Sequence, residues 1–303
     1  MKAQVGTGPA GRPAPLAGLI ARRPRLGRWR LLFGVPANLT GAIIAALFLF
    51  LSAVGAVWTP RSSVNGSLMD VLRAPSWAHP FGTDDLGRDI LSRVLAGAHL
   101  ELEVALIVLL VAGLLGIVLG LLTGYLGGWF DEIVMRVTDI FLGFPALLFA
   151  VMLGAALGPS LGHAILAMSV VWWPWYARIL RGQVIKLRHD QFVEAAYAIG
   201  ASPWRIMLKH ILPNTIQALL IQATLDVGSA ILTAATLGFV GLGAQPPVPE
   251  WGAMVAEGQQ YVLAQWWVAV FPGLAIMIVS IGFSLLGDGL RDVLDPALSP
   301  YTK

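Results

Sequence analysis

The sequence predicts an all-α polytopic membrane protein with six transmembrane helices and both termini in the cytoplasm. Hydrophobic residues make up 57% of the 303 residues and charged residues 12%, and the mean hydropathy of +0.75 is too high for a soluble globular domain. Long uncharged runs alternate with short polar segments. Lysine and arginine gather in every second polar segment, as they do in the cytoplasmic loops of membrane proteins.

Residues 1–36 form a basic tail with seven Lys and Arg residues and no acid, which predicts a cytoplasmic location. The uncharged run at 37–58 is long enough to cross a ~30 Å hydrocarbon core as a helix rising ~1.5 Å per residue. We interpret it as a retained first transmembrane helix. The alternative is a signal peptide with Ala53 and Ala56 as its small residues, but so long a charged region before the apolar core is atypical.

Residues 59–100 carry four basic and four acidic residues, and this balance predicts an extracytoplasmic segment. Within it, we expect a turn and then a helix at the membrane surface, capped by Thr83. Asp89 and Arg93 stand four residues apart and could pair, for ~0.3–0.5 kcal/mol. The apolar side of this helix would consist of Leu86, Ile90, Leu91 and Val94.

The second span is expected at 104–129. Its glycines at spacing four form a smooth strip where another helix can approach closely, and they are Gly116, Gly120 and Gly124. A short polar turn would then reverse the chain at Asp131, Glu132 and Arg136. The next uncharged run, 140–177, is too long for one span, and Gly158-Pro159-Ser160 divides it into spans three and four.

A fifth span should follow Asn214 and end near Gly243, and a sixth should cover 261–286. The loop 244–251 between them has three prolines and no basic residue, so we expect a stiff external structure. Residues 288–303 would form a cytoplasmic tail. This topology places 16 of the 20 Lys and Arg residues inside and 4 outside.

The segment 190–214, which we call the elbow, separates spans four and five and is strongly basic, so it should lie in the cytoplasm. Asp190 can cap a helix that begins at Gln191 and that Gly200 ends. Ser202 and Pro203 can start a second helix that runs until Pro213. A solvated connector is the ordinary alternative, but the elbow is long and rich in small residues that favour contact with another protein.

The elbow resembles the EAA loop of binding-protein-dependent ATP-binding-cassette (ABC) importer permeases, through Glu194-Ala195-Ala196, Gly200 and Leu212-Pro213. His210 stands where the family pattern has isoleucine, although Ile211 beside it can fill an apolar contact. Three other stretches resemble the dipeptide, oligopeptide and nickel permeases, and together with the elbow they cover residues 80–297. These stretches are Phe81-Gly82-Thr83-Asp84-Asp85-Leu86-Gly87-Arg88-Asp89, Gly241-Leu242-Gly243-Ala244-Gln245-Pro246-Pro247 and Gly287-Asp288-Gly289-Leu290-Arg291-Asp292.

The resemblance implies a type I ABC importer permease fold in the plasma (inner) membrane, with a five-helix core at 101–287. The chain has no G-x-x-x-x-G-K-[ST] phosphate loop. We therefore expect no enzyme activity and no cofactor on this chain, with ATP and Mg bound by two partner ATPase subunits. The other implied partners are a second homologous permease, which completes the pore, and an extracytoplasmic substrate-binding protein. The expected cargo is di- or oligopeptides, with nickel chelates or glutathione-like compounds as alternatives.

Three sets of candidate site residues follow from the resemblance and from the residues. Contact with the ATPase is assigned to Glu194, Ala195, Ala196, Gly200, Ala201, Leu212 and Pro213. The substrate path is assigned to Asp226, Trp172 and Trp175, with ordinary packing as the alternative for the tryptophans. An external gate or binding-protein contact is assigned to Gln245, Pro246, Pro247 and Trp251, with a plain stiff loop as the alternative.

Other classes of function fit these sequence features less well than an importer permease does. An ion-coupled secondary transporter would use the intramembrane acids Asp226 and Asp139, although Asp139 also fits an interfacial acid near Arg136. A membrane hydrolase is disfavoured because the five histidines do not cluster and no H-E-x-x-H or G-x-S-x-G motif occurs. No cluster of metal ligands stands out in the spans. Nucleic acid is excluded as a partner because the basic residues flank apolar runs rather than form a patch.

Overall fold

A computed structural model describes residues 34–294, so the predicted basic tail lies outside it except for its last three residues, as does most of the C-terminal tail. The described residues are mostly helical and contain no strand beyond one isolated bridge between Thr83 and Asp89. The main helices are α2 (Pro36–Val57), α3 (Ile90–Leu126), α4 (Gly128–Gly143), α5 (Ala146–Leu157), α6 (Leu161–Leu187), α7 (Gln191–Ala198), α8 (Pro203–Arg205), α9 (Leu212–Phe239), α10 (Trp251–Gly258) and α11 (Trp267–Leu294).

The all-α membrane class is confirmed, because four helical segments of the described chain are long and apolar enough to cross a membrane. They are α2, α3, the continuous segment Pro203–Phe239 and α11. A fifth candidate is the pair α4 and α5, which bends by 91° at the break between them. This break falls at Phe144-Pro145, where the proline disfavours helical geometry in the residue before it. The second break, at 158–160, was predicted and separates α5 from α6.

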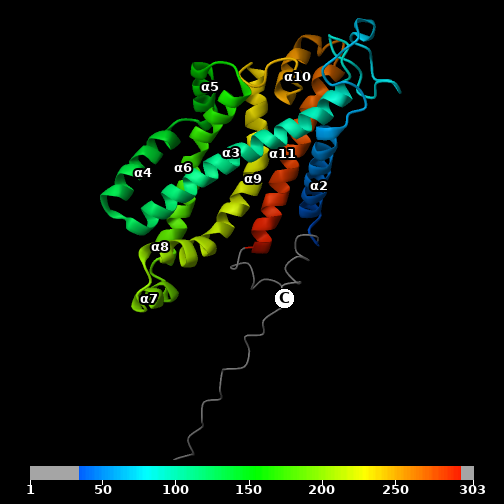
Figure 1. Ribbon diagram of the computed structural model, residues 1–303. Coiled ribbons are helices and arrows are strands. Elements are labelled where there is room, and N and C mark those ends of the chain that lie inside the picture. The colour runs from blue at the N-terminus through cyan, green and yellow to red at the C-terminus, as the bar shows by residue number, and fades with distance from the viewer. Residues whose placement is uncertain (1–33, 295–303) are drawn as a thin grey trace, which may run out of the picture.

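The helices cross between two ends of the molecule (Figure 1). The short helices α7 and α8 lie at one end, the elbow end, together with the start of α2 and the end of α11. Helix α10 and the segment 59–89 lie at the other, the α10 end. Helix α3, 37 residues long, runs obliquely from the α10 end towards the elbow end. The described part of the chain thus starts and finishes at the same end as the elbow.

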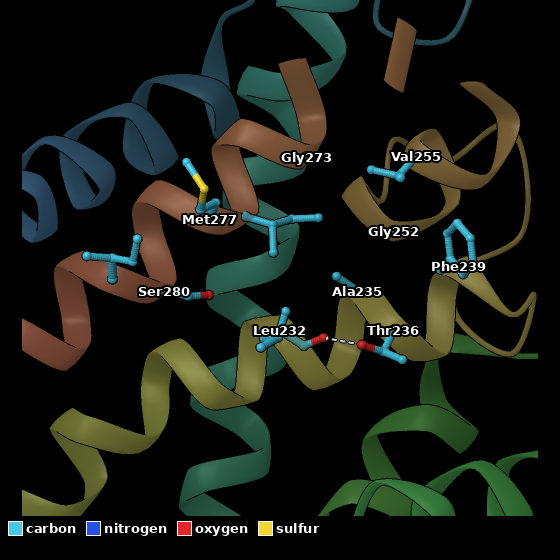
Figure 2. A pocket seen from close by; sticks show the side chains of 11 residues that line it. Leu232, Ala235, Thr236, Phe239, Gly252, Val255, Gly273, Met277 and Ser280 are labelled. Carbon is cyan, nitrogen blue, oxygen red and sulfur yellow. Dashed lines mark hydrogen bonds between the residues drawn. The ribbon is translucent and has the colours of Figure 1, made fainter. Parts of the chain in front are cut away.

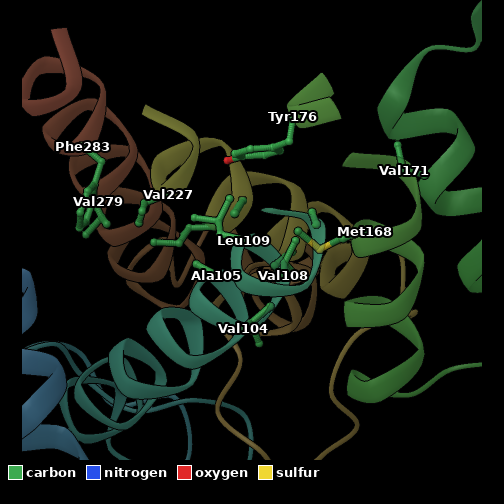
Figure 3. Close-up of a cluster of buried hydrophobic side chains, with 14 of the residues drawn as sticks. Val104, Ala105, Val108, Leu109, Met168, Val171, Tyr176, Val227, Val279 and Phe283 are labelled. Carbon is green, nitrogen blue, oxygen red and sulfur yellow. The ribbon is translucent and has the colours of Figure 1, made fainter. Parts of the chain in front are cut away.

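The glycine strip of α3 brings α6 into close contact, as predicted. A Cβ atom added to Gly116 would lie 2.3 Å from Cβ of Tyr176, and one added to Gly124 would lie 2.7 Å from Cβ of Val184. A Cβ atom added to Gly120 would likewise lie too close to the backbone carbonyl oxygen of Ala177. Buried side chains from α3, α6, α9 and α11 fill the interior beside this contact (Figure 3). Small residues therefore set the distance between the two most closely packed helices.

The surface helix predicted from Thr83 does not form, and the next α-helix after α2 begins at Ile90 with Asp89 as its N-cap. The carboxylate of Asp84 instead accepts hydrogen bonds from the backbone N–H groups of Leu86 (3.0 Å) and Arg88 (2.8 Å), which stabilises a turn. Gly87 completes this turn at a φ of +69°. The predicted Asp89–Arg93 pair is wrong too, because Asp89 accepts from Ser92 and contacts His79.

The polar turn predicted at 131–136 is also wrong, since these residues lie within α4. The chain reverses earlier, at Gly127 and Gly128, which both have a φ of +65°. Asp131 then pairs with Arg181 on α6, at 2.5 Å from Nε. Asp139 pairs with Arg178 on α6, and Arg136 contacts Glu132 at 3.6 Å. Asp131 and Asp139 therefore join α4 to α6 instead of lying in a loop.

Candidate functional site

The first half of the elbow is a short helix closed by a glycine. Helix α7 begins at Gln191, as expected, and the carbonyl of Asp190 accepts from the N–H groups of Val193 and Glu194, although the Asp190 side chain makes no capping bond. Gly200 has a φ of +78°, and the N–H of Ala201 reaches the carbonyl of Ala196 across it at 3.0 Å. Space around Gly200 is open, so its backbone angle is what requires glycine.

The second half of the elbow runs directly into α9, and the predicted end at Pro213 is wrong. Helix α8 passes into a π-helical stretch over Ile206–Ile211, in which the N–H of Leu212 bonds to the carbonyl of Met207. Pro213 then falls in the first turn of α9, directly after this π-helical stretch, and the helix continues through it. Motion of the elbow can therefore pass to a membrane-spanning helix without an intervening loop.

Burial divides the elbow into an inner and an outer side. Ala196, like Ile211, is buried against the rest of the protein, whereas Glu194 and Ala195 are exposed. His210 is half-buried, so the buried aliphatic position next to it belongs to Ile211. The outer side exposes a set of large apolar residues, with Ile199 85% exposed and Trp204 61% exposed. The other exposed members of this apolar tip are Phe192, Tyr197 and Leu208.

The elbow is joined to the end of α3 by polar contacts. The hydroxyl groups of Tyr125 on α3 and Tyr197 on α7 are hydrogen-bonded to each other. Arg188, which follows α6, donates to the carbonyl of Gly124 at 3.3 Å. The elbow thus contacts α3 through Tyr197 and continues into α9.

Asp226 lies in α9 and is half-buried between helices. Its Oδ2 accepts a hydrogen bond of 2.7 Å from the hydroxyl of Tyr176 on α6, and its Oδ1 accepts one of 2.9 Å from Gln222. No basic side chain forms an ion pair with it among residues 34–294. An acid held by neutral donors inside a membrane protein is a candidate functional site.

The sequence reasoning missed Tyr176 as the partner of Asp226, although it is adjacent to Trp175. Trp175 is 49% exposed and Trp172 is half-buried against the hydrophobic core. Pro174 lies inside α6, which continues through it. No hydrogen bond among residues 34–294 joins either tryptophan to Asp226, so the substrate path through these three residues stays a prediction.

The loop 244–251 exposes part of the predicted external site and buries the rest. Gln245, Pro246 and Pro247 are exposed, and the peptide bond between the two prolines is cis. Trp251 is only 2% exposed, so it cannot belong to an outer contact surface in this conformation. Its Nε1 donates to the carbonyl of Val94 at 3.0 Å, and Gly97 lies directly against its ring. Trp251 instead fixes the start of α10 to α3.

A cluster of buried charges, unpredicted from the sequence, joins the segment 59–89 to α10. Arg88 donates from Nε to Asp84 at 2.6 Å and from a terminal nitrogen to Glu257 at 3.0 Å. Arg93 lies 3.4 Å from Glu257 and 3.5 Å from Asp84. Both arginines are at most 2% exposed. We call these four residues the arginine cluster. Three of them lie in the charge-balanced segment and Glu257 lies in α10, and their spacing gave no signal that they pack together.

A pocket of about 490 Å³ lies between α9, α10 and α11 (Figure 2). Its lining is apolar apart from Thr236 and Ser280, whose hydroxyl groups donate to the carbonyls of Leu232 and Gly228. The pocket therefore suits apolar groups rather than a charged solute. Asp226 is not among its lining residues, so the two features are separate.

The chain matches a known protein family and several of its members. The model of the family "Binding-protein-dependent transport system inner membrane component" matches residues 116–300. The chain is 49% identical to the probable D,D-dipeptide transport system permease protein DdpC of Escherichia coli (strain K12), over 88% of this chain and 89% of that protein. It is 44% identical to the dipeptide transport system permease protein DppC of Alkalihalophilus pseudofirmus, over 86% of each chain.

A third relative is the glutathione transport system permease protein GsiD of Escherichia coli O6:K15:H31, with 43% identity over 85% of this chain and 86% of that protein. Among solved structures, an inward-facing form of the MetNI methionine ABC transporter superimposes with a TM-score of 0.49 and 23% identity. That match covers 67% of this chain and 96% of the other.

Proposed function

We propose that this chain, which belongs to the family of binding-protein-dependent transport system inner membrane components, forms half of the translocation path of an ATP-driven importer. It is a multi-pass permease of the inner membrane. A second homologous permease would complete the path, two ATP-binding subunits would supply energy, and an extracytoplasmic protein would deliver the substrate. The observation that carries the proposal is the exposed apolar tip of the elbow, which is continuous with α9.

The proposed topology has six spans and both termini in the cytoplasm. The six are the four single spans, the bent pair of α4 and α5, and α6, whose 27 residues reach ~40 Å at ~1.5 Å per residue. The alternation of the helices between the two ends supports this count (Figure 1). The excess of Lys and Arg at the elbow end supports a cytoplasmic elbow.

The elbow would act as the contact through which the ATPase moves the spans. Exposed apolar residues of this size are typical of a protein–protein contact when they gather at one place. The buried side of α7, its hydrogen bond to α3 and the continuity of the elbow with α9 would turn a displacement of the elbow into a tilt of several helices. Alternating access of this kind is a rigid-body motion around a central path.

Peptides are the proposed cargo, with nickel chelates and glutathione-like compounds as the alternatives. The names of the three relatives refer to D,D-dipeptides, dipeptides and glutathione, which all contain amide-linked amino acids and an ammonium group. Asp226, held by neutral donors, offers a negative site in the spans that could attract such an ammonium group. Specificity would still rest largely with the substrate-binding protein.

Asp226 also favours the one competing function, an ion-coupled transporter, since protonatable acids in spans serve in such carriers. The test is uptake by the reconstituted complex with its binding protein, at clamped ATP, with and without an uncoupler. Substrate-stimulated ATP hydrolysis over a panel of peptides and chelates would identify the cargo. Uptake that persists without ATP and stops with the uncoupler would contradict the proposed importer.

A further inference from the structure

Two buried carboxyl groups meet where the loop 244–250 enters α10. Glu101 on α3 is 1% exposed and Glu250, the N-cap of α10, is 3% exposed. Oε1 of Glu101 accepts the backbone N–H of Trp251 at 3.1 Å, while its Oε2 has no partner among the described residues. Both oxygens of Glu250 accept backbone N–H groups, from Gly252 and Ala253, at 2.8 Å.

The backbone of α9 and of the loop after it packs closely against Glu250. A Cβ atom added to Gly238 on α9 would lie 1.7 Å from a carboxylate oxygen of Glu250, and Gly243 is also close. Helices α2 and α9 bring no basic residue, and the charged residues of α11 are all at its elbow end. On α3, Glu103 and His99 are exposed. Tyr261, in the turn that follows α10, is half-buried beyond its far end.

The other charges near the pair belong to the arginine cluster. Glu257 of this cluster repels the negative form of Glu250, but it already pairs with Arg88 and Arg93. The remaining acids there are Asp84, which contacts both arginines, and Asp85, 3.9 Å from Arg88. Burial raises the pKa of the Glu250 carboxyl above its ordinary value. Two neighbouring buried carboxylates without a cation repel each other strongly, and one retained proton removes that repulsion.

We propose that Glu101 and Glu250 form a proton-binding site in which one shared proton holds α10 and the loop 244–250 against α3. With the proton bound, the Glu101 carboxyl donates to the Glu250 carboxylate from the oxygen that otherwise lacks a partner. When the proton leaves to solvent, both groups are negative, and the start of α10 and the loop separate from α3. The loop exposes Gln245, Pro246 and Pro247, so proton release opens the surface of the α10 end.

Thiol labelling of the assembled transporter tests this proposal, since the native chain has no cysteine. Ala244 is 5% exposed and Gln245 is exposed, so A244C reports opening of the loop and Q245C reports the ordinary effect of pH on thiol reactivity. We expect the ratio of the A244C to the Q245C labelling rate to rise several-fold from acidic to alkaline pH. In the E101Q background, whose amide supplies a permanent donor to Glu250, the ratio should not change with pH. E103Q, an exposed position on the same helix, should behave as the wild type.

A wild-type ratio that stays constant with pH, or an E101Q ratio that rises as in the wild type, would overturn the proposal. Infrared difference spectra between the two pH values provide a second reading that needs no labelling. We expect the carbonyl band of a protonated carboxyl group in the wild type and in E103Q, and its loss in E101Q. A band that persists unchanged in E101Q would show that the proton lies elsewhere.

Discussion

The hydroxyl of Tyr176 on α6 donates a hydrogen bond of 2.7 Å to the carboxylate of Asp226 on α9, and Gly116 on α3 packs directly against the same tyrosine. Three helices thus meet at one acid inside the spans. If this acid attracts the ammonium group of a peptide, D226N should raise the KM for uptake of peptides with a free amino terminus, about tenfold for ~1.4 kcal/mol. N-acetylated peptides should be affected less.

Y176F is the matched control for D226N, because it removes one neutral donor and keeps the charge. We expect it to change the KM by less than D226N does. Equal effects of D226N on free and acetylated peptides would show that Asp226 has a structural role and does not bind substrate.

Gly200 should tolerate asparagine but not valine, because its φ of +78° is accessible to asparagine and strained for a β-branched residue. We expect G200V to insert and assemble while ATP hydrolysis no longer drives uptake. G200N should retain most of the uptake. The measurement is the number of substrate molecules taken up per ATP hydrolysed, and an unchanged ratio in G200V would contradict the role of the elbow.

Ile199 is the most exposed residue of the apolar tip, at 85%, and its truncation tests the contact with the ATPase. We expect I199A to weaken association with the ATP-binding subunits by ~1–2 kcal/mol, as for a residue near the centre of an interface. L110A, on an exposed face of α3 with 62% exposure, should leave association unchanged. Co-purification of the ATPase with each variant at increasing salt gives the comparison.

Removing one member of the arginine cluster should be strongly destabilising, because it leaves the remaining charges without compensation. R93M leaves Glu257 and Asp84 without one of their partners, and we expect a loss of ~3–5 kcal/mol. R136M breaks an exposed pair with Glu132 and should cost at most ~1 kcal/mol. Thermal unfolding of the assembled complex measures both, and equal shifts for the two variants would contradict the structural role of the cluster.

Several structural features that depend only on residues close together in the sequence were predicted correctly. The uncharged run of α2, the glycine strip of α3, the start of α7 and the turn at Gly200 all follow from composition, spacing or capping. The segment around Thr83 shows where such signals fail, because its apolar spacing also suits a helix. Asp84 is held there by Arg93 and, through Arg88, is linked to Glu257, which is distant in sequence.

Two other unpredicted features have different causes. Trp251 follows a proline-rich loop that suggests exposure, yet Phe48 and Gly97 pack against its ring and Glu101 accepts its backbone N–H, and all three are distant in sequence. Pro213 suggests the end of a helix, yet the π-helical stretch immediately before it shifts the bonding pattern and the helix continues.

Stability should fall as the pH rises if the shared proton holds α10. The pKa values of Glu250 and Glu257 are raised by burial, so the folded state binds protons more tightly than the unfolded state. Their contribution is complete below the ordinary glutamate pKa of about 4.3 and is lost as the pH rises through the raised values. We expect the Tm of the assembled complex to fall across this range, and to fall less in E101Q than in E103Q. A Tm that rises with pH in the wild type would show that the charged forms of these carboxyl groups, rather than the protonated ones, stabilise the α10 end.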